Sequence, residues 1–366
     1  MTSEKASEYG RLEPMLAPLE ALVRCESPTE DLDACREVVR LASDIATRVL
    51  GVPAQIKEIE GRPVFWWGDE QPEVLILAHL DTVWPIGSFT PLWEIEGDVL
   101  RGPGTYDMKA GFLQALYAMR TLDLSKVVLI ATTDEETGSA TTRELIENVS
   151  KKAKAVLVLE SAIDGKVKIG RKGTSMYKIT VHGRAAHAGL EPEKGINATV
   201  EIATIVNTLM ALGNKEFGTT VVPTVMNSGT TTNTVPALAT LDIDCRSFTL
   251  AEMQRVQSAI KNLTLIHPDA KIEVVGGINR PPLETTSTQA LYEKCEAVAK
   301  KLGMAPLGSA SVGGASDGNF AGIHTQVLDG LGAVGEGAHA THEHILASHL
   351  EPRAKLLAAL VKEILA

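Results

Sequence analysis

Six side chains in this sequence have the chemistry needed to bind metal ions and move protons. They are His79, Asp107, Glu135, Glu136, Glu160 and His339. Imidazole nitrogen and carboxylate oxygen are common zinc ligands, and two such ions can lie about 3.5–4 Å apart. Two histidines and three carboxylates suit a pair of zinc ions with one carboxylate bridging them. We therefore expect a two-metal site with one further carboxylate beside it.

Four of these side chains follow apolar runs that are typical of buried strands. The runs are Val74–Ala78 before His79, Val127–Ile130 before Glu135 and Glu136, and Ala155–Leu159 before Glu160. Ligands bind outside the carboxyl ends of strands in parallel α/β sheets, so these side chains should face one crevice. Adjacent residues of an extended chain point in opposite directions. Glu135 and Glu136 should therefore have different tasks, one holding a cation and the other moving protons.

The two histidines have different sequence contexts. Asp81 follows His79 by two residues, where its carboxylate could accept the other ring N–H and fix the tautomer. His339 follows a glycine-rich segment that could bring the backbone close to a ligand. His342 and His344 are near enough in the sequence to be alternatives to His339.

The composition excludes several classes of partner. The chain has 46 acidic and 35 basic residues, which argues against binding to nucleic acid or to an anionic membrane. Its four cysteines are scattered and form no C-x-x-C pair, as expected for reduced thiols in a cytosolic protein. The first residues lack the pattern of a secretion signal, and no apolar run approaches the ~20 residues of a membrane span. We therefore expect a soluble, cytoplasmic protein.

The elements that must position these residues alternate between helix and strand. Residues 11–50 predict two helices separated at Ser27–Thr29, residues 54–67 predict a hairpin, and residues 109–122 predict an amphipathic helix that leads into the strand before the glutamates. Strand, helix, strand repeats are typical of a parallel sheet with helices on its faces. From residue 283 onward the same α/β character returns. Residues 1–172 and 283–366 are therefore expected to form one catalytic domain.

The intervening residues 173–282 have a different pattern. Tyr177–His182 and Ala239–Arg246 alternate apolar and polar residues, as half-exposed strands do. Helical patterns occupy residues 197–212 and 250–263, and further strands are expected near residues 220–226 and 272–275. The resulting order β, α, β, β, α, β with one solvated face predicts a ferredoxin-like inserted domain.

Five motifs occur together in an order that is specific to one family. They are His79–Val83, Gly104–Gly111, Thr133–Gly138, Glu160 and Gly337–His339. Over nearly its whole length the chain resembles the M20 family of metallopeptidases, and most of all its glutamate carboxypeptidase (carboxypeptidase G2-like) members. The resemblance implies a zinc-exopeptidase-like α/β catalytic domain with a mixed, largely parallel sheet. The inserted domain would then be a lid and the site of homodimer formation.

The resemblance also implies a role for each metal ligand. Asp107 would bridge two zinc ions, His79 and Glu160 would complete one site, and Glu136 and His339 would complete the other. The peptide bond after Asp107 would be cis.

Further roles follow from the same resemblance. Glu135 would be the general base, and His187, in the loop Gly183–Gly189, would reach into the partner subunit's site and stabilise the oxyanion. Asn233 and Arg246 would grip a substrate carboxylate, and Arg280 is a further candidate for that task. The alternative for Arg246 is an ordinary surface ion pair with Asp242 or Asp244.

Together these expectations describe a hydrolase with two zinc ions per subunit, or cobalt or manganese in their place. It would cleave an amide bond next to a free C-terminal carboxylate in a peptide or small molecule, as a glutamate carboxypeptidase does. An N-acyl-amino-acid amidohydrolase (aminoacylase) or a dipeptidase on the same scaffold is the alternative. A non-catalytic metal-binding scaffold is a remote one, since neither the ligands nor the base are missing.

Two other motif matches carry little weight. Gly314–Gly318 matches G-x-S-x-G, but the preceding residues do not form an apolar strand, so a serine nucleophile is not expected. Gly330–Gly335 matches G-x-G-x-x-G, but no helix pattern begins there, so a dinucleotide site is not expected either.

Overall fold

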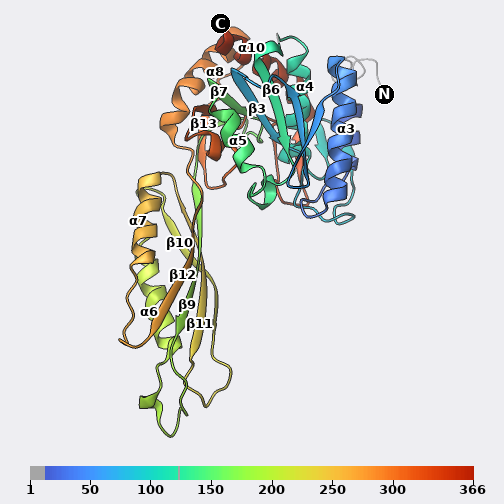
Figure 1. Cartoon of the computed structure of the whole chain (residues 1–366). Coiled ribbons are helices and arrows are strands. Elements are labelled where there is room, and N and C mark those ends of the chain that lie inside the picture. The colour runs from blue at the N-terminus through green and yellow to red at the C-terminus, as the bar shows by residue number, and fades with distance from the viewer. Residues whose placement is uncertain (1–12, 123) are drawn as a thin grey trace. The chain divides into compact units, whose positions relative to one another are not determined.

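The structure of this chain is a computed structural model that describes residues 13–122 and 124–366. Its internal contacts divide the chain into two units, whose elements are labelled in Figure 1. Unit 1 comprises the described residues up to Gly170, together with Glu284–Val312 and Ser316–Ala366. Unit 2 comprises Arg171–Leu283 and Gly313–Ala315. Each unit has a hydrophobic core of its own.

A six-stranded sheet forms the centre of unit 1, in the order β1-β2-β6-β3-β7-β14. The strands are β1 (Gln55–Ile59), β2 (Arg62–Gly68), β3 (Val74–His79), β6 (Val127–Thr132), β7 (Ala155–Val158) and β14 (Gln326–Leu328). The pairs β1–β2 and β2–β6 are antiparallel, whereas β6, β3, β7 and β14 are parallel to one another. The predicted mixed, largely parallel sheet is confirmed.

The central strands β3, β6 and β7 are buried on both faces of this sheet, which explains why they are continuous apolar runs. Ile76 and Leu129 belong to one core cluster with Phe112 and Leu356 from two helices, whereas Leu77 is buried on the opposite face. The helices of unit 1 are α2 (Glu13–Arg24), α3 (Leu32–Leu50), α4 (Ala110–Met119), α5 (Arg143–Ser150), α8 (Gln289–Lys301), α9 (Gly318–Ala321) and α10 (Leu350–Leu365). Helices α4 and α10 pack on each other and on β3, and α9 packs on β7 and β14.

Several short strands of unit 1 were not predicted from the sequence. A four-stranded antiparallel sheet in the order β15-β16-β5-β4 consists of β15 (Gly335–Glu336), β16 (His344–Leu346), β5 (Val99–Arg101) and β4 (Glu94–Glu96). A separate pair joins β8 (Val167–Arg171) to β13 (Ser309–Val312). The small sheet places residues 344–346 beside residues 99–101. The G-x-G-x-x-G segment opens no helix, as expected, and leads instead into the unpredicted strand β15.

Unit 2 is a four-stranded antiparallel sheet with two helices. Its elements are β9 (Gly173–His182), α6 (Ala198–Met210), β10 (Thr220–Ser228), β11 (Leu238–Ser247), α7 (Leu250–Lys261) and β12 (Lys271–Arg280), and the strand order is β10-β11-β9-β12. In β9 the buried Tyr177, Ile179 and Val181 alternate with more exposed residues, and they share a core cluster with Ile202 of α6 and Val256 of α7. This order and the single buried face agree with the ferredoxin-like prediction.

The four cysteines are all free, as the sequence predicted. Burial raises the pKa of Cys35, Cys245 and Cys295 to about 12, so these thiols are protonated and unreactive at neutral pH. Within residues 13–122 and 124–366, no helix has both the length and the apolar character required to cross a bilayer.

Candidate metal centre

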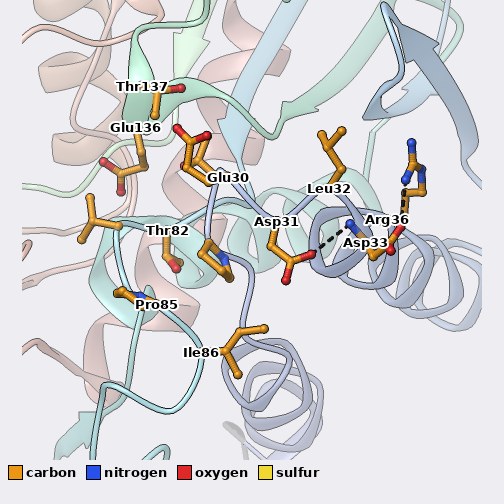
Figure 2. Close-up of a pocket in the computed structure, with 13 residues that line it drawn as sticks. Glu30, Asp31, Leu32, Asp33, Arg36, Thr82, Pro85, Ile86, Glu136 and Thr137 are labelled. Carbon is orange, nitrogen blue, oxygen red and sulfur yellow. Dashed lines mark hydrogen bonds and ion pairs between the residues drawn. The ribbon is translucent and has the colours of Figure 1, made fainter.

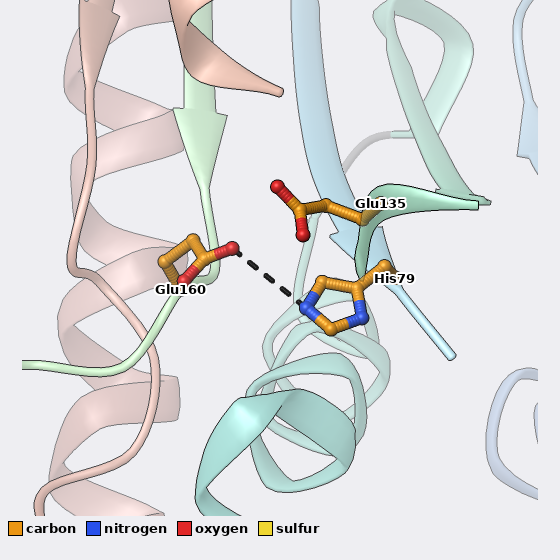
Figure 3. Close-up of side chains that lie close together, drawn as sticks. All are labelled: His79, Glu135 and Glu160. Carbon is orange, nitrogen blue, oxygen red and sulfur yellow. Dashed lines mark ion pairs between the residues drawn. The ribbon is translucent and has the colours of Figure 1, made fainter. Parts of the chain in front are cut away.

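Three neighbouring parallel strands deliver donor side chains to one edge of the main sheet. Strand β3 ends at His79 and lies between β6 and β7, which precede Glu135 and Glu160 by a few residues. Figure 3 shows both carboxylates directed toward the imidazole ring, with 3.7 Å between His79 Nε2 and Glu160 Oε1. Since the carboxyl ends of parallel strands lie at the same edge, the strand pattern is enough to bring these three groups together.

The Asp107 carboxylate lies between the two histidines. Its Oδ1 is 3.3 Å from His79 Nε2, and its Oδ2 is 3.4 Å from His339 Nε2. His339 Nε2 is also 3.0 Å from Glu136 Oε2. One oxygen of Asp107 therefore faces the pair formed by His79 and Glu160, and the other faces the pair formed by His339 and Glu136. The peptide bond after Asp107 is cis, as the resemblance implied.

This donor set fits a pair of divalent metal ions. The ligand atoms of His79, Asp107 and Glu136 lie within 4.8 Å of one another, and so do those of His79, Glu135 and Glu160. The side chains of Glu136 and Glu160 are only 5% and 8% exposed, and burying several carboxylates together is unfavourable unless cations compensate them. Since Glu135 belongs to one of these groups, its position is compatible with binding a metal ion and with acting beside one.

The imidazoles and carboxylates of the cluster shift one another's pKa. Hydrogen bonds to Asp107 and Glu136 raise the pKa of His339 to about 10. Burial lowers the pKa of His79, but its hydrogen bonds to Asp107 and Asp81 outweigh this effect and hold that pKa well above the ordinary value. Burial also acts to raise the pKa of Asp107, yet its hydrogen bonds to the two histidines keep it below its usual range. Burial raises the pKa of Glu136 to about 8. At neutral pH the cluster therefore holds protons that a metal ion must displace.

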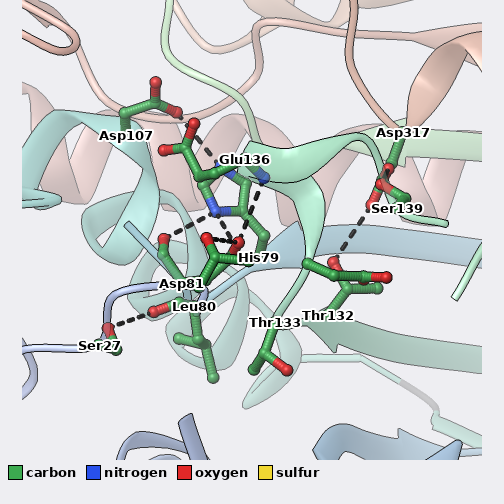
Figure 4. Close-up of polar contacts among 12 residues, drawn as sticks. Ser27, His79, Leu80, Asp81, Asp107, Thr132, Thr133, Glu136, Ser139 and Asp317 are labelled. Carbon is green, nitrogen blue, oxygen red and sulfur yellow. Dashed lines mark hydrogen bonds and ion pairs between the residues drawn. The ribbon is translucent and has the colours of Figure 1, made fainter. Parts of the chain in front are cut away.

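Asp81 contacts His79 mainly through its main chain. His79 Nδ1 lies 3.1 Å from the carbonyl oxygen of Asp81 and 3.4 Å from its Oδ1. The other carboxylate oxygen, Oδ2, accepts a hydrogen bond from Thr29 Oγ1 at 2.7 Å. It also accepts one from the backbone N–H of Glu136 at 3.2 Å (Figure 4). The sequence predicted a contact between Asp81 and His79, but not that the carbonyl oxygen of Asp81 would be the nearer acceptor. The Asp81 carboxylate links the His79 strand end to the backbone of Glu136, and the carbonyl is the nearer acceptor for the ring.

The two adjacent glutamates lie in a turn of 3-10 helix, Glu135–Thr137, and not in an extended strand. The buried Asp134 holds this turn, because its carboxylate accepts hydrogen bonds from the backbone N–H groups of Thr141 and Thr142 and from the Thr142 hydroxyl. The helical turn still separates the two side chains. Glu136 meets His339, and Glu135 meets the group that contains Glu160.

The discounted G-x-S-x-G segment supports this same turn. Ser316 is buried, and its hydroxyl donates to Asp329 Oδ2 at 2.7 Å. The next residue, Asp317, accepts hydrogen bonds from the hydroxyls of Thr132 and Ser139, which lie on either side of the glutamates (Figure 4). The segment thus anchors the chain around Glu135 and Glu136, in agreement with the prediction that it is not a nucleophile elbow.

The loop that carries His339 explains which histidine joins the cluster. His339 has a left-handed backbone, with φ of 60°, and follows Gly337, whose φ is 87°. A Cβ at position 337 would lie 2.9 Å from Glu343 Cα, so only glycine fits this close approach. The loop turns the His339 ring toward the carboxylates, whereas the His344 ring lies 2.9 Å from the carbonyl oxygen of His342. His339 therefore contacts the cluster, whereas the nearest acceptor of the His344 ring lies in its own loop.

The structure adds Glu343, which our sequence analysis missed. Its side chain is buried, and its carboxylate accepts hydrogen bonds from the backbone N–H groups of Gly104, Tyr106 and Asp107. Burial raises the pKa of this carboxyl to about 7, against the effect of these donors. A signal was present in the sequence, because this glutamate stands between two histidines and follows His339 by four residues.

In unit 2 the structure brings His187 and Asn233 together. The backbone N–H of Ala188 donates to the carbonyl oxygen of Asn233 at 2.8 Å, and His187 forms an isolated bridge with Thr234. Both side chains are exposed. Two loops that are far apart in the sequence therefore bring the backbones of His187 and Asn233 together at one end of this sheet.

Arg246 lies toward the other end of the same sheet and pairs with Asp244. Its Nε is 3.0 Å from Asp244 Oδ1, and its Nη2 is 3.2 Å from Oδ2. Arg246 and Arg280 both lie opposite Thr174 of β9, one on each neighbouring strand. The pKa of Lys172 is lowered by burial and by the nearby positive charge of Arg246. These cations form a positively charged corner of unit 2, and Lys172 was not among the residues selected from the sequence.

A pocket with a volume of about 890 Å³ adjoins Glu136 in unit 1 (Figure 2). Its lining consists of Pro28, Thr29, Glu30, Asp31, Leu32, Asp33, Arg36, Thr82, Val83, Pro85, Ile86, Glu136 and Thr137. Asp31 caps α3, and Asp33 pairs with Arg36 at 2.9 Å. The pocket offers space for part of a ligand next to the donor cluster.

Comparisons with known proteins agree with this arrangement. Residues 75–363 match the sequence model of peptidase family M20/M25/M40. Carboxypeptidase G2 of Pseudomonas sp. (strain RS-16) is 30% identical over 308 residues, which cover 80% of this chain and 74% of that protein. Succinyl-diaminopimelate desuccinylase 2 of Shewanella loihica (strain ATCC BAA-1088 / PV-4) is 29% identical over 312 residues, or 76% of this chain and 81% of that protein.

A solved structure shows the same fold. The crystal structure of aminopeptidase PepT from Bacillus cereus ATCC 10987 superimposes with a TM-score of 0.78 at 24% identity, covering 97% of this chain and 99% of that one. The fold, the donor cluster and the family match point to the same conclusion. The chain belongs to peptidase family M20/M25/M40, and the protein is a metallopeptidase or amidohydrolase of the M20 type.

Proposed function

We propose that this protein is a di-zinc hydrolase that cleaves an amide bond next to a free C-terminal carboxylate, as a glutamate carboxypeptidase-type exopeptidase does. The observation that carries the proposal is the position of Asp107, whose two oxygens face two different donor pairs. The similarity of the chain to carboxypeptidase G2 supports the proposal that the scissile amide bond lies next to a C-terminal carboxylate. Cobalt or manganese could occupy the same oxygen and nitrogen donors.

Glu135 is the proposed general base. Divalent ions held by the five ligands would polarise the scissile carbonyl and lower the pKa of a water molecule. The Glu135 carboxylate takes the proton from the attacking water and returns it to the leaving nitrogen. Its position beside His79 and Glu160 supports this role, because a base must lie within hydrogen-bonding reach of water at the metal ions.

The positively charged corner of unit 2 is the proposed site for the substrate carboxylate. The planar guanidinium of Arg246 is suited to bidentate capture of a carboxylate, and its present partner Asp244 shows that it can make such contacts. Arg280 and Lys172 add positive charge nearby. A substrate carboxylate would compete with Asp244 for Arg246.

His187 and Asn233 would then act from the partner subunit of a homodimer. Strand β11 runs from Leu238 to Ser247, so Asn233 lies beyond one end of it and Arg246 lies close to the other. At ~3.3 Å per residue, Leu238 and Arg246 alone are about 26 Å apart. One chain therefore cannot place both Asn233 and Arg246 on a single carboxylate, whereas two chains can.

Unit 2 has a suitable surface for such a dimer. Strand β10 lies at an edge of its sheet and carries the exposed side chains of Val222, Val225 and Met226. An exposed, apolar edge strand is prone to pair with another chain. We therefore place the proposed dimer contact at this edge.

The second candidate is an N-acyl-amino-acid amidohydrolase or a dipeptidase on the same scaffold. The similarity to a succinyl-diaminopimelate desuccinylase favours it, because that name also denotes hydrolysis of an acyl amide. A non-catalytic scaffold is disfavoured, since the cluster retains its donors and Glu135.

A substrate screen distinguishes these functions. N-acyl amino acids and dipeptides would be tested with the terminal residue varied, starting with glutamate and aspartate, with and without a chelator. We expect chelator-sensitive release of a C-terminal acidic residue and no cleavage of the matching C-terminal amides. Equal cleavage of the amides would contradict the proposed role of the carboxylate, and a preference set by the acyl group would favour the second candidate.

A further inference from the structure

Glu343 is a buried carboxylate that accepts four hydrogen bonds and is not one of the five proposed ligands. Its Oε1 accepts hydrogen bonds from the backbone N–H groups of Tyr106 and Asp107, at 2.9 and 3.1 Å. Its Oε2 accepts from the backbone N–H of Gly104 at 3.0 Å and from the indole Nε1–H of Trp84 at 3.1 Å. The residue is 1% exposed, so water does not replace these contacts.

The fold brings this carboxylate to the Asp107 turn through two long-range connections. Strand β16 pairs with β5, so the residues after Glu343 run beside the residues that lead into the turn. The close approach at Gly337 then folds the loop 337–343 back on itself. As a result, one loop contacts Asp107 twice, with His339 on its side chain and Glu343 on its backbone.

The chemistry of these contacts requires a carboxylate. Three backbone N–H groups of one turn, those of Gly104, Tyr106 and Asp107, donate to Glu343. A buried N–H group without an acceptor lowers the stability of the fold. Each carboxylate oxygen accepts two donors here, and the ionised carboxylate is the form that offers acceptors alone. A glutamine could satisfy one pair of donors, but its NH₂ group would face the other pair.

We propose that Glu343 is a positioning residue of the metal centre. By holding the turn from Gly104 to Asp107, it fixes the two Asp107 oxygens so that one faces His79 and the other faces His339. It acts through Asp107 and is not itself one of the five ligands. This inference rests on the proposed metal centre, although it requires no particular substrate.

The test measures metal binding without any substrate. Metal-free wild type and Glu343→Gln would be titrated with Co²⁺ alone, with the visible absorption spectrum recorded at each step. We expect the variant to bind at least one of two Co²⁺ ions about 10–100-fold more weakly, with a changed spectrum, because Asp107 is no longer held in a bridging position. Wild-type affinity and spectrum for Glu343→Gln would overturn the proposal.

Glu336→Gln is the matched control. It makes the same chemical change at an exposed position of the same segment and should bind Co²⁺ like the wild type. If Glu343→Gln does not fold by circular dichroism, Trp84→Phe decides the question, because it removes one of the four donors and leaves the carboxylate in place. We expect a weaker effect for it, a loss of affinity below about tenfold with a shifted spectrum. A wild-type titration for Trp84→Phe in that case would overturn the proposal.

The outcomes separate this inference from the proposed function. If the wild type does not bind Co²⁺ stoichiometrically, the metal centre itself is wrong and the role of Glu343 falls with it. If the wild type binds two ions and Glu343→Gln does the same, only the positioning role is wrong. A failure to cleave C-terminal glutamate would leave the titration unchanged and would contradict only the choice of substrate.

Discussion

At the scale of single residues, the donor cluster is a set of acids and imidazoles that share protons. His339 donates to both Asp107 and Glu136, and this raises its pKa to about 10. Burial raises the pKa of Glu136 to about 8. Both values lie above the ordinary ones, so the proton-bound forms dominate at lower pH. Metal ions must compete with these protons for the same lone pairs.

Metal affinity should therefore rise with pH. Between about pH 6 and 8 we expect the affinity for Zn²⁺ to increase about tenfold per pH unit for each proton displaced. Calorimetric titrations in buffers with different ionisation enthalpies would count the protons released, and we expect at least one per metal-free site. An affinity that does not change over this range, with no proton release, would show that the cluster is not protonated as described.

Sequence reasoning predicted the residue types of the site but not all of their contacts. Each proposed ligand stands at a strand end or in a recognisable motif, so its chemistry is visible in the sequence. The nearer contact of Asp81 to His79 is through its carbonyl oxygen, and backbone acceptors carry no residue-type signal. Glu343 was missed for a related reason, since its partners are mostly backbone N–H groups of a distant turn.

At the scale of elements, the site depends on the turn that follows β6. Asp134 is buried, and three hydrogen bonds from Thr141 and Thr142 converge on its carboxylate. These contacts close the turn on which Glu135 and Glu136 are presented. Because of this turn, Glu135 and Glu136 are adjacent in the sequence but contact different residues.

Replacing this anchor should cost both stability and activity. We expect Asp134→Ala to lower the free energy of unfolding by about 2–4 kcal/mol, because two backbone N–H groups and a hydroxyl lose a buried acceptor. Urea unfolding followed by circular dichroism would measure this change. Asp44→Ala, at an exposed position of α3, is the control and should stay within about 0.5 kcal/mol of the wild type. A similar small value for Asp134→Ala would mean that the turn is held by other contacts.

The main elements were predictable, and the short ones were not. Strands β3, β6 and β7 are apolar runs, and β9 and β11 alternate, so burial alone specifies them. The small sheet that joins β5 to β16 consists of strands of two or three residues, in segments rich in glycine and proline. Its pairing comes from tertiary contacts, which the local pattern does not encode.

At the scale of the whole molecule, the proposed chemistry divides between two units and two chains. Unit 1 holds the donor cluster and Glu135, whereas unit 2 holds Arg246, His187 and Asn233. Because β11 separates Asn233 from Arg246 by most of its length, the proposed substrate site would draw these two residues from two copies of the chain.

Mixing two inactive variants tests this division. His187→Ala should lower the rate about 100-fold through loss of an oxyanion donor, and Glu135→Ala should be lower still. If His187 acts in the partner subunit, each mixed dimer has one site with both residues intact. A refolded equimolar mixture should then recover about a quarter of the wild-type activity. If the mixture shows only the summed activities of the two separate variants, His187 and Glu135 act in the active site of one and the same chain.

The inserted unit could be predicted because its alternating strands differ from the buried runs on either side. The identity of its partner could not be predicted in the same way. An exposed apolar edge such as β10 shows that a surface is available for pairing, but the pattern of one chain does not specify what pairs with it.

The most direct test of the account is the metal content of Glu135→Ala, measured together with its rate of hydrolysis. We predict two metal ions per chain, as in the wild type, and a rate lower by about three or more orders of magnitude, because the change removes the proton carrier and no ligand. Loss of one or both metal ions from this variant would contradict the account, since it would make Glu135 a ligand.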